Sequence, residues 1–133
     1  MITDRKARSE RLRKMRERIF SFEEIKDEDF TVPFSHTTTL QVCGILTNIL
    51  NKNIEIPVPR VYPTYEGGVS AEWTIDKHIA IDIIFDMLNG TINGYATNVD
   101  NGDFIGLSLR TDKLNKSKKI ANYIIKCIKN LSN

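Results

Sequence analysis

Residues 69–85 alternate between apolar and polar side chains, and this alternation constrains the fold more than any other feature of the chain. The alternation resumes at Ile79 after the polar stretch 76–78. A period of two residues is typical of a strand with one buried face. With a three-residue turn at 76–78, Trp73 lies opposite Ile81. The apolar positions before the turn are Val69, Ala71, Trp73 and Ile75.

Two Asn-Gly pairs, at 89–90 and 101–102, mark the next two turns. An Asn-Gly pair accepts the positive φ angles that a two-residue type I′ hairpin needs. If each pair forms the centre of its turn, Ile83 lies opposite Ala96, and Ala96 lies opposite Leu107. Every strand then places its apolar residues on one face, which predicts an α+β fold: a four-stranded antiparallel meander with helices packed on one face, preceded by a basic N-terminal helix.

The other face of the predicted sheet brings two carboxylates together. Glu72 falls opposite Asp82, and directly opposed like charges destabilise a strand pair. The two are either solvated, bridged by a lysine, or kept for an arginine or lysine of a partner or for a metal. A metal is the weakest of these interpretations, so we expect no metal site. Glu72, Asp82 and Tyr95 are our partner-binding candidates on this face.

A longer signature leads into the first of these strands. It reads Pro59-x-Val61-x-Pro63-Thr64-x-x-Gly67-Gly68-Val69-x-x-Glu72-Trp73, followed by Ile79-Ala80-Ile81-Asp82-Ile83. The signature resembles a recurrent pattern in small uncharacterised bacterial proteins, which look like stand-alone proteins often suspected of serving a neighbouring gene product. The resemblance implies a shared sheet and carries no catalytic chemistry. This chain departs from the pattern at 65–66, where an Asp is usual before the glycines.

Charge divides the chain into distinct parts, although the net charge is only +2. The first twenty residues are basic, an acidic run follows, and the last predicted helix is rich in lysine. We therefore predict a basic helical arm at 1–20, an acidic linker at 21–34 and a single α+β domain at 35–133. A chain of 133 residues is long enough to bury one hydrophobic core.

The predicted arm is a helix with a narrow apolar seam formed by Leu12, Met15 and Ile19. Such a helix is marginal alone, so it either docks by its seam or orders on a partner. We expect residues 1–18 to add little to fold stability and much to the binding of acidic protein or nucleic-acid phosphates. The candidate contacts are Arg8, Arg11, Lys14 and Arg18.

Two more helices are predicted to cover the sheet, at 35–53 and 114–131. The first follows a capping Ser35, and both carry an apolar face. The prolines between 57 and 63 predict an extended, poorly pairing lead-in to the sheet.

The two cysteines indicate the compartment of the protein. Cys43 and Cys127 fall in apolar helical patterns, which predicts buried, reduced thiols in a cytoplasmic protein. No apolar run approaches the length of a membrane span, and the N-terminus carries no apolar signal-peptide core. We expect no membrane association, and the sequence makes no prediction of oligomeric state.

The motifs of common enzyme classes are missing from the sequence. It contains no Gly-x-Gly-x-x-Gly, P-loop, Cys-x-x-Cys, His-Glu-x-x-His or Gly-x-Ser-x-Gly. We therefore predict a non-enzymatic protein–protein interaction module without a cofactor, serving one macromolecular partner in the manner of an antitoxin, immunity protein or inhibitor. Two alternatives stay open. One is a sequence-tolerant nucleic-acid-binding protein using the arm and the C-terminal lysines, and the other is a small hydrolase using Glu72 and Asp82.

Overall fold

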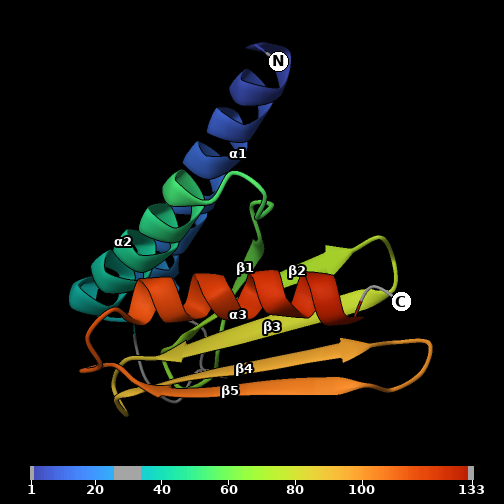
Figure 1. Ribbon diagram of the computed structural model, residues 1–133. Helices are drawn as coiled ribbons and strands as arrows, with labels where there is room; N and C mark the ends of the chain where they lie inside the picture. The colour runs from blue at the N-terminus through green and yellow to red at the C-terminus, as the bar shows by residue number, and fades with distance from the viewer. Residues whose placement is uncertain (1, 26–33, 132–133) are drawn as a thin grey trace.

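The computed structural model describes residues 2–25 and 34–131, and within α1 it describes side chains from residue 5 onward. The described chain is an α+β fold in which helices pack on an antiparallel sheet (Figure 1). The predicted acidic linker falls mainly on residues 26–33, which lie outside this description. The helices are α1 (Ile2–Ser21), the short 3-10 helix η1 (Phe22–Glu24), α2 (His36–Lys52) and α3 (Lys116–Leu131). The strands are β1 (Arg60–Pro63), β2 (Val69–Ile75), β3 (Ile79–Asp86), β4 (Thr91–Asn98) and β5 (Phe104–Arg110).

The sheet has five strands in the order β1-β2-β3-β4-β5, one more than the predicted four-stranded meander. The additional strand is β1, which pairs Arg60 with Glu72 and Pro63 with Val69. We predicted this stretch as an extended, poorly pairing lead-in because of its prolines. That prediction was wrong because β1 is an edge strand, and an edge tolerates proline where no N–H is needed for pairing.

The predicted register between β2 and β3 is confirmed, with Trp73 opposite Ile81 and Glu72 opposite Asp82. The three-residue turn at 76–78 contains two non-glycine residues with positive φ, Asp76 at 51° and Lys77 at 65°. Aspartate tolerates this region better than most residues do, but lysine carries the usual steric cost of a Cβ there.

The two Asn-Gly hairpins differ from the prediction by a shift of two residues. Ile83 pairs with Gly94 rather than Ala96, and Ala96 pairs with Ile105 rather than Leu107. Each connection is a four-residue loop, at 87–90 and 99–102, in which only the glycine has positive φ. A type I′ turn needs positive φ at both central residues. The predicted faces are nevertheless correct, because a shift of two residues preserves the side-chain alternation.

Side chains hold these longer loops in place. The Asp86 carboxylate accepts from the backbone N–H of Asn89 at 3.3 Å and from its side-chain amide at 2.8 Å. In the second loop, Asn98 Oδ1 accepts from the N–H groups of Asp100 and Asn101 at 2.9 and 3.2 Å. Asn and Asp favour turns because their side chains replace a backbone acceptor in this way.

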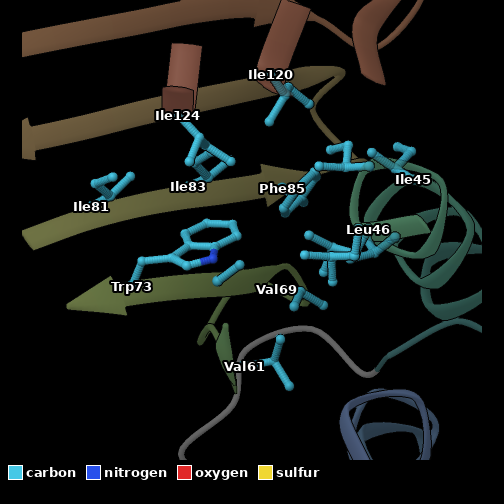
Figure 2. Packing of buried hydrophobic residues seen from close by; sticks show 14 of the residues in the cluster. Ile45, Leu46, Val61, Val69, Trp73, Ile81, Ile83, Phe85, Ile120 and Ile124 are labelled. Carbon is cyan, nitrogen blue, oxygen red and sulfur yellow. The ribbon is translucent and has the colours of Figure 1, made fainter. Parts of the chain in front are cut away.

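The core lies between the inner face of the sheet and the helices (Figure 2). Trp73, Ile81, Ile83 and Ala96 are buried there as predicted, whereas Leu107 is only half-buried. The last helix, α3, crosses in front of β3, β4 and β5 (Figure 1).

Gly94 admits α3 at this crossing. A Cβ at Gly94 would lie 2.8 Å from the Tyr123 ring, and the Tyr123 hydroxyl donates to the carbonyl of Ile105 at 2.6 Å. Burial raises the pKa of this phenol.

The N-terminal helix docks by its seam, since Leu12, Met15 and Ile19 are all buried against the rest of the protein. It packs beside α2 (Figure 1). Its start lies at the C-terminal end of α2, where Arg8 contacts the Leu50 carbonyl, and the following η1 lies at the beginning of α2. The two helices are therefore antiparallel.

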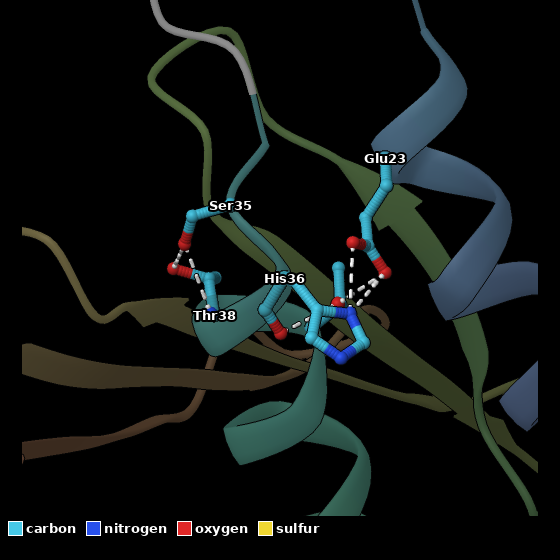
Figure 3. Close-up of polar contacts among 5 residues, drawn as sticks. Glu23, Ser35, His36 and Thr38 are labelled. Atoms are coloured by element: carbon cyan, nitrogen blue, oxygen red, sulfur yellow. Dashed lines mark hydrogen bonds and ion pairs between the residues drawn. The ribbon is translucent and has the colours of Figure 1, made fainter.

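Polar contacts secure the start of α2 (Figure 3). The hydroxyl of Ser35 accepts from the backbone N–H of Thr38 at 3.0 Å, as predicted for an N-cap. The carboxylate of Glu23 in η1 accepts from the Thr39 hydroxyl at 2.8 Å and pairs with the His36 ring at 2.9 Å. These contacts, led by the one from Thr39, lower the pKa of Glu23.

Both thiols, Cys43 and Cys127, are free and buried, and burial raises the pKa of each. None of the described helices is both long and apolar enough to cross a membrane.

Candidate functional site

The three sheet residues predicted to bind a partner lie in one row across the strands. Glu72 on β2 pairs with Asp82 on β3, and Asp82 pairs with Tyr95 on β4. Directly paired residues project from the same face of a sheet. The structure thus brings Glu72, Asp82 and Tyr95 together on the face opposite the core, which we call the open face.

A shallow hollow of about 490 Å³ lies on this open face. Two aromatic side chains stand at it, Tyr95 with 49% and Phe104 with 61% of its surface exposed. Its other outward-facing residues are Glu72, Thr74, Ala80, Asp82 and Thr97. Exposed aromatic residues, tyrosine above all, are enriched in the surfaces through which proteins bind one another.

The opposed carboxylates have neighbours of their own within the chain. Asp82 accepts a hydrogen bond from the Ser70 hydroxyl at 2.5 Å. Arg60 on β1 is the register partner of Glu72 and extends the row by one strand. Sequence reasoning missed Arg60 because it treated this stretch as a poorly pairing lead-in and not as a strand of the sheet. A strand prediction at 60–63 would have placed a base beside Glu72.

Two of the four predicted basic contacts are engaged inside the protein. Arg8 donates to the carbonyls of Leu50 at 2.8 Å, Ile56 at 2.7 Å and Asn53 at 3.3 Å. These carbonyls lie at and beyond the last turn of α2, where backbone acceptors lack helical partners and the helix dipole favours a cation. Burial lowers the pKa of Arg8, followed by the nearby charge of Arg11.

Arg18 is the second engaged base. Its Nε donates to the carbonyl of Val61 on β1 at 2.7 Å. Its guanidinium carbon also lies 5.5 Å from the ring centroids of both Phe22 and Tyr62, a distance at which cation–π attraction operates. Arg8 and Arg18 therefore attach α1 to the domain, a role that sequence reasoning did not assign to them.

The remaining pair, Arg11 and Lys14, is exposed and lines a separate hollow of about 420 Å³ between α1 and β1. Arg18 and Arg60 also line it, and its lining includes no acidic residue. The predicted basic and sheet residues therefore form two separate surfaces, which share no lining residue.

A third and larger hollow, of about 890 Å³, separates α2 from α3. Its basic residues are Lys52, Lys116 and Lys118, and amide side chains supply much of the remaining polar surface. The sequence indicated the lysine-rich face of the last helix, but only the packing of α2 beside α3 makes it one wall of a groove.

Within 2–25 and 34–131, no group of three or more His, Cys, Asp and Glu side chains is placed to hold a metal ion. Both histidines lie instead in exposed pairs, His36 with Glu23 and His78 with Asp100.

The signature at 59–83 folds into β1, β2 and the first part of β3, so it contributes two of the three residues of the open-face row, Glu72 and Asp82. No protein-family model, curated protein or solved structure matches the chain.

Proposed function

We propose that this chain is a non-enzymatic protein–protein interaction module that binds one macromolecular partner through the open face of its sheet. Its role would be that of an antitoxin, immunity protein or inhibitor. The observation that carries the proposal is the exposure of Tyr95 and Phe104 around a hollow that also holds Glu72 and Asp82.

The chemistry of the hollow suits a partner that inserts an arginine or lysine. The rings of Tyr95 and Phe104 would contact the aliphatic part and the cation, and the carboxylates of Glu72 and Asp82 would accept its N–H groups. Binding at this hollow costs little backbone conformational entropy, because its side chains project from strands that are already hydrogen-bonded into the sheet. The free, buried thiols of Cys43 and Cys127 support a reducing compartment such as the cytoplasm.

The first experiment compares two truncated side chains. The protein is immobilised and incubated with lysate of the organism that encodes it, and retained proteins are identified by mass spectrometry. We expect one retained protein to be lost with Tyr95→Ser and kept with Leu114→Ser, since Leu114 is 83% exposed but lies off the sheet. Equal retention by both variants would contradict the proposal.

A charge reversal sharpens the experiment. Glu72→Lys places a cation where the partner's cation is expected to bind, so affinity for the retained protein falls. Glu66→Lys makes the same charge change in the exposed loop before β2 and leaves affinity unchanged. If the two variants weaken binding equally, the effect is one of net charge and the open face is not the contact.

The hollow between α1 and β1 supports one alternative, a sequence-tolerant nucleic-acid-binding protein. Its support is that Arg11, Lys14 and Arg60 line one hollow whose lining includes no acidic residue. Three phosphate contacts would make affinity fall roughly 40-fold between about 50 and about 200 mM salt.

The test of this alternative titrates the protein with mixed single- and double-stranded DNA and RNA at both salt concentrations. Micromolar binding that is abolished by the double variant Arg11→Glu/Lys14→Glu, but survives the same charge change at two exposed lysines elsewhere, Lys52→Glu/Lys77→Glu, would establish the alternative. No binding at either salt concentration would exclude this alternative.

A further inference from the structure

We propose that two copies of this chain associate edge to edge through β5, so that their sheets join into one antiparallel sheet about a two-fold axis at Leu107. The occupant of the β5 edge is thus a second copy of the same chain. This inference is independent of what binds the open face.

The first observation is that β5 lacks the usual protection of an edge strand. It is the last strand in the sheet order, and Figure 1 shows no element of the described chain beyond it. Natural edges are blunted by proline, central charges, bulges, short length or a covering element. β5 is seven residues long, contains no proline and carries its single charge at the last residue, Arg110.

The second observation is the direction of the backbone groups of β5. Asn98 donates to the carbonyl of Asp103, and Thr111 donates to the carbonyl of Gly90, both at 2.9 Å. In an antiparallel pair, every second residue of a strand forms backbone hydrogen bonds to the neighbouring strand. The odd-numbered residues of β5 are therefore the ones that bond to β4. The N–H and C=O groups of the even-numbered residues therefore point outward. These residues are Phe104, Gly106, Ser108 and Arg110.

The third observation is that β5 is complementary to itself in one antiparallel register. With Leu107 opposite Leu107 of the second copy, Gly106 lies opposite Ser108 and Phe104 lies opposite Arg110. These pairs consist of the even-numbered residues whose backbone groups point outward. Each such pair is of the hydrogen-bonded kind, in which both N–H groups find an acceptor. The carbonyl of Arg110 also accepts from Lys113 at 3.1 Å, a contact that leaves its second lone pair for the new strand.

Side chains on both faces support this register. On the open face, Phe104 has 61% of its surface exposed and would lie beside the exposed guanidinium of Arg110 of the second copy, a cation–π pair. On the inner face, Ile105, Leu107 and Leu109 are half-buried, because the sheet stops there, and the second copy's strand would cover their free side. Phe104 also lines the open-face hollow, so this pairing would make the open faces of the two copies continuous.

The first test measures mass by sedimentation velocity over a range of protein concentrations. We expect a species of twice the 15.2 kDa of the chain. Ser108→Pro removes an outward N–H without touching the bonds to β4, so it should dissociate this species and leave the circular dichroism spectrum unchanged. Ser108→Ala keeps the N–H and should stay dimeric. A monomer at every concentration, or a Ser108→Pro dimer as stable as that of Ser108→Ala, would overturn the proposal.

A second pair of variants tests the register and decides the matter if Ser108→Pro does not fold. In Leu107→Cys the two new thiols face each other across the axis with Cα atoms about 4.5 Å apart, within disulfide range. In Ile105→Cys, on the same face, the new thiols would be roughly 13 Å apart. Under mild oxidation we expect a covalent dimer from Leu107→Cys only, with the wild-type protein as the control for Cys43 and Cys127. Equal cross-linking of both variants, or of neither, would overturn the register.

Discussion

The two edges of the sheet are built in opposite ways. At β1 the outward backbone groups belong to Val61 and Pro63, because Tyr62 and Arg60 bond to β2. Proline has no N–H, and the carbonyl of Val61 accepts from Arg18. At β5 the outward groups of Phe104, Gly106 and Ser108 have no strand of the described chain beside them. One edge is closed by the protein's own helix, and the other is left available for assembly.

Closing the β1 edge requires α1 to be a permanent part of the fold. Its seam is buried, Arg8 bonds to the end of α2 and Arg18 bonds to β1. The expectation that residues 1–18 add little stability therefore has to be revised. This difference between the two edges is tested most directly by a substitution in α1, followed by measurement of the stability of the whole domain.

The largest effect is expected at the most deeply buried residue of the seam. Ile19 is fully buried, so Ile19→Ala should lower the free energy of unfolding by about 2–5 kcal/mol through lost burial and a residual cavity. Ile54, with 71% of its surface exposed, provides the control, and Ile54→Ala should cost less than about 0.5 kcal/mol. Urea unfolding measures both. A small effect at Ile19 would mean that α1 is a detachable arm after all.

The next effect concerns the β5 side, where α3 approaches β4 over a glycine. Gly94→Ala places a Cβ 2.8 Å from the Tyr123 ring and 2.9 Å from Cβ of Leu107, so it should cost about 1–3 kcal/mol by overpacking. Gly44→Ala is the matched control. It lies inside α2 with nothing within 4 Å of its new Cβ, and should stabilise the protein by up to about 1 kcal/mol. Equal signs in thermal unfolding would refute the close approach of α3.

A smaller effect is expected from the residue that closes the β1 edge. Arg18→Ala loses the bond to Val61 and the contacts with Phe22 and Tyr62, at a cost of about 1–2 kcal/mol. Arg13→Ala, on the same helix, removes only exposed ion pairs with Glu10 and Glu17, which solvent screens, and should cost clearly less than Arg18→Ala. If urea unfolding ranks the two arginines in the reverse order, closure of the edge does not depend on Arg18.

The smallest effect is the pH dependence of the contact between η1 and α2. The folded pKa of Glu23 is lowered, first by the bond from Thr39 and then by His36, so its contribution is complete above the ordinary pKa of 4.5. It is lost as the pH falls through the lowered folded value. The urea midpoint should therefore fall more steeply below about pH 4.5 in the wild-type protein than in Glu23→Gln. Parallel pH profiles would show that this contact contributes nothing.

The open-face row was predictable from the sequence, and the basic surface was predictable only in part. Glu72, Asp82 and Tyr95 were placed on one face because alternation decides which residues share a face. The roles of Arg8 and Arg18 were not accessible, because both donate to carbonyls at least forty residues away. Backbone acceptors leave no mark in the sequence at such distances.

Local periodicity and turn chemistry were enough to predict the α+β class, the faces of the strands, the capped start of α2 and the turn at 76–78. The register of the two Asn-Gly hairpins was not predictable in this way, since a shift of two residues leaves every side chain on its face. Only the tertiary structure decided that 60–63 forms a strand. That strand exists because β2 pairs with one side of it and Arg18 of α1 bonds to the other, and neither contact is local in the chain.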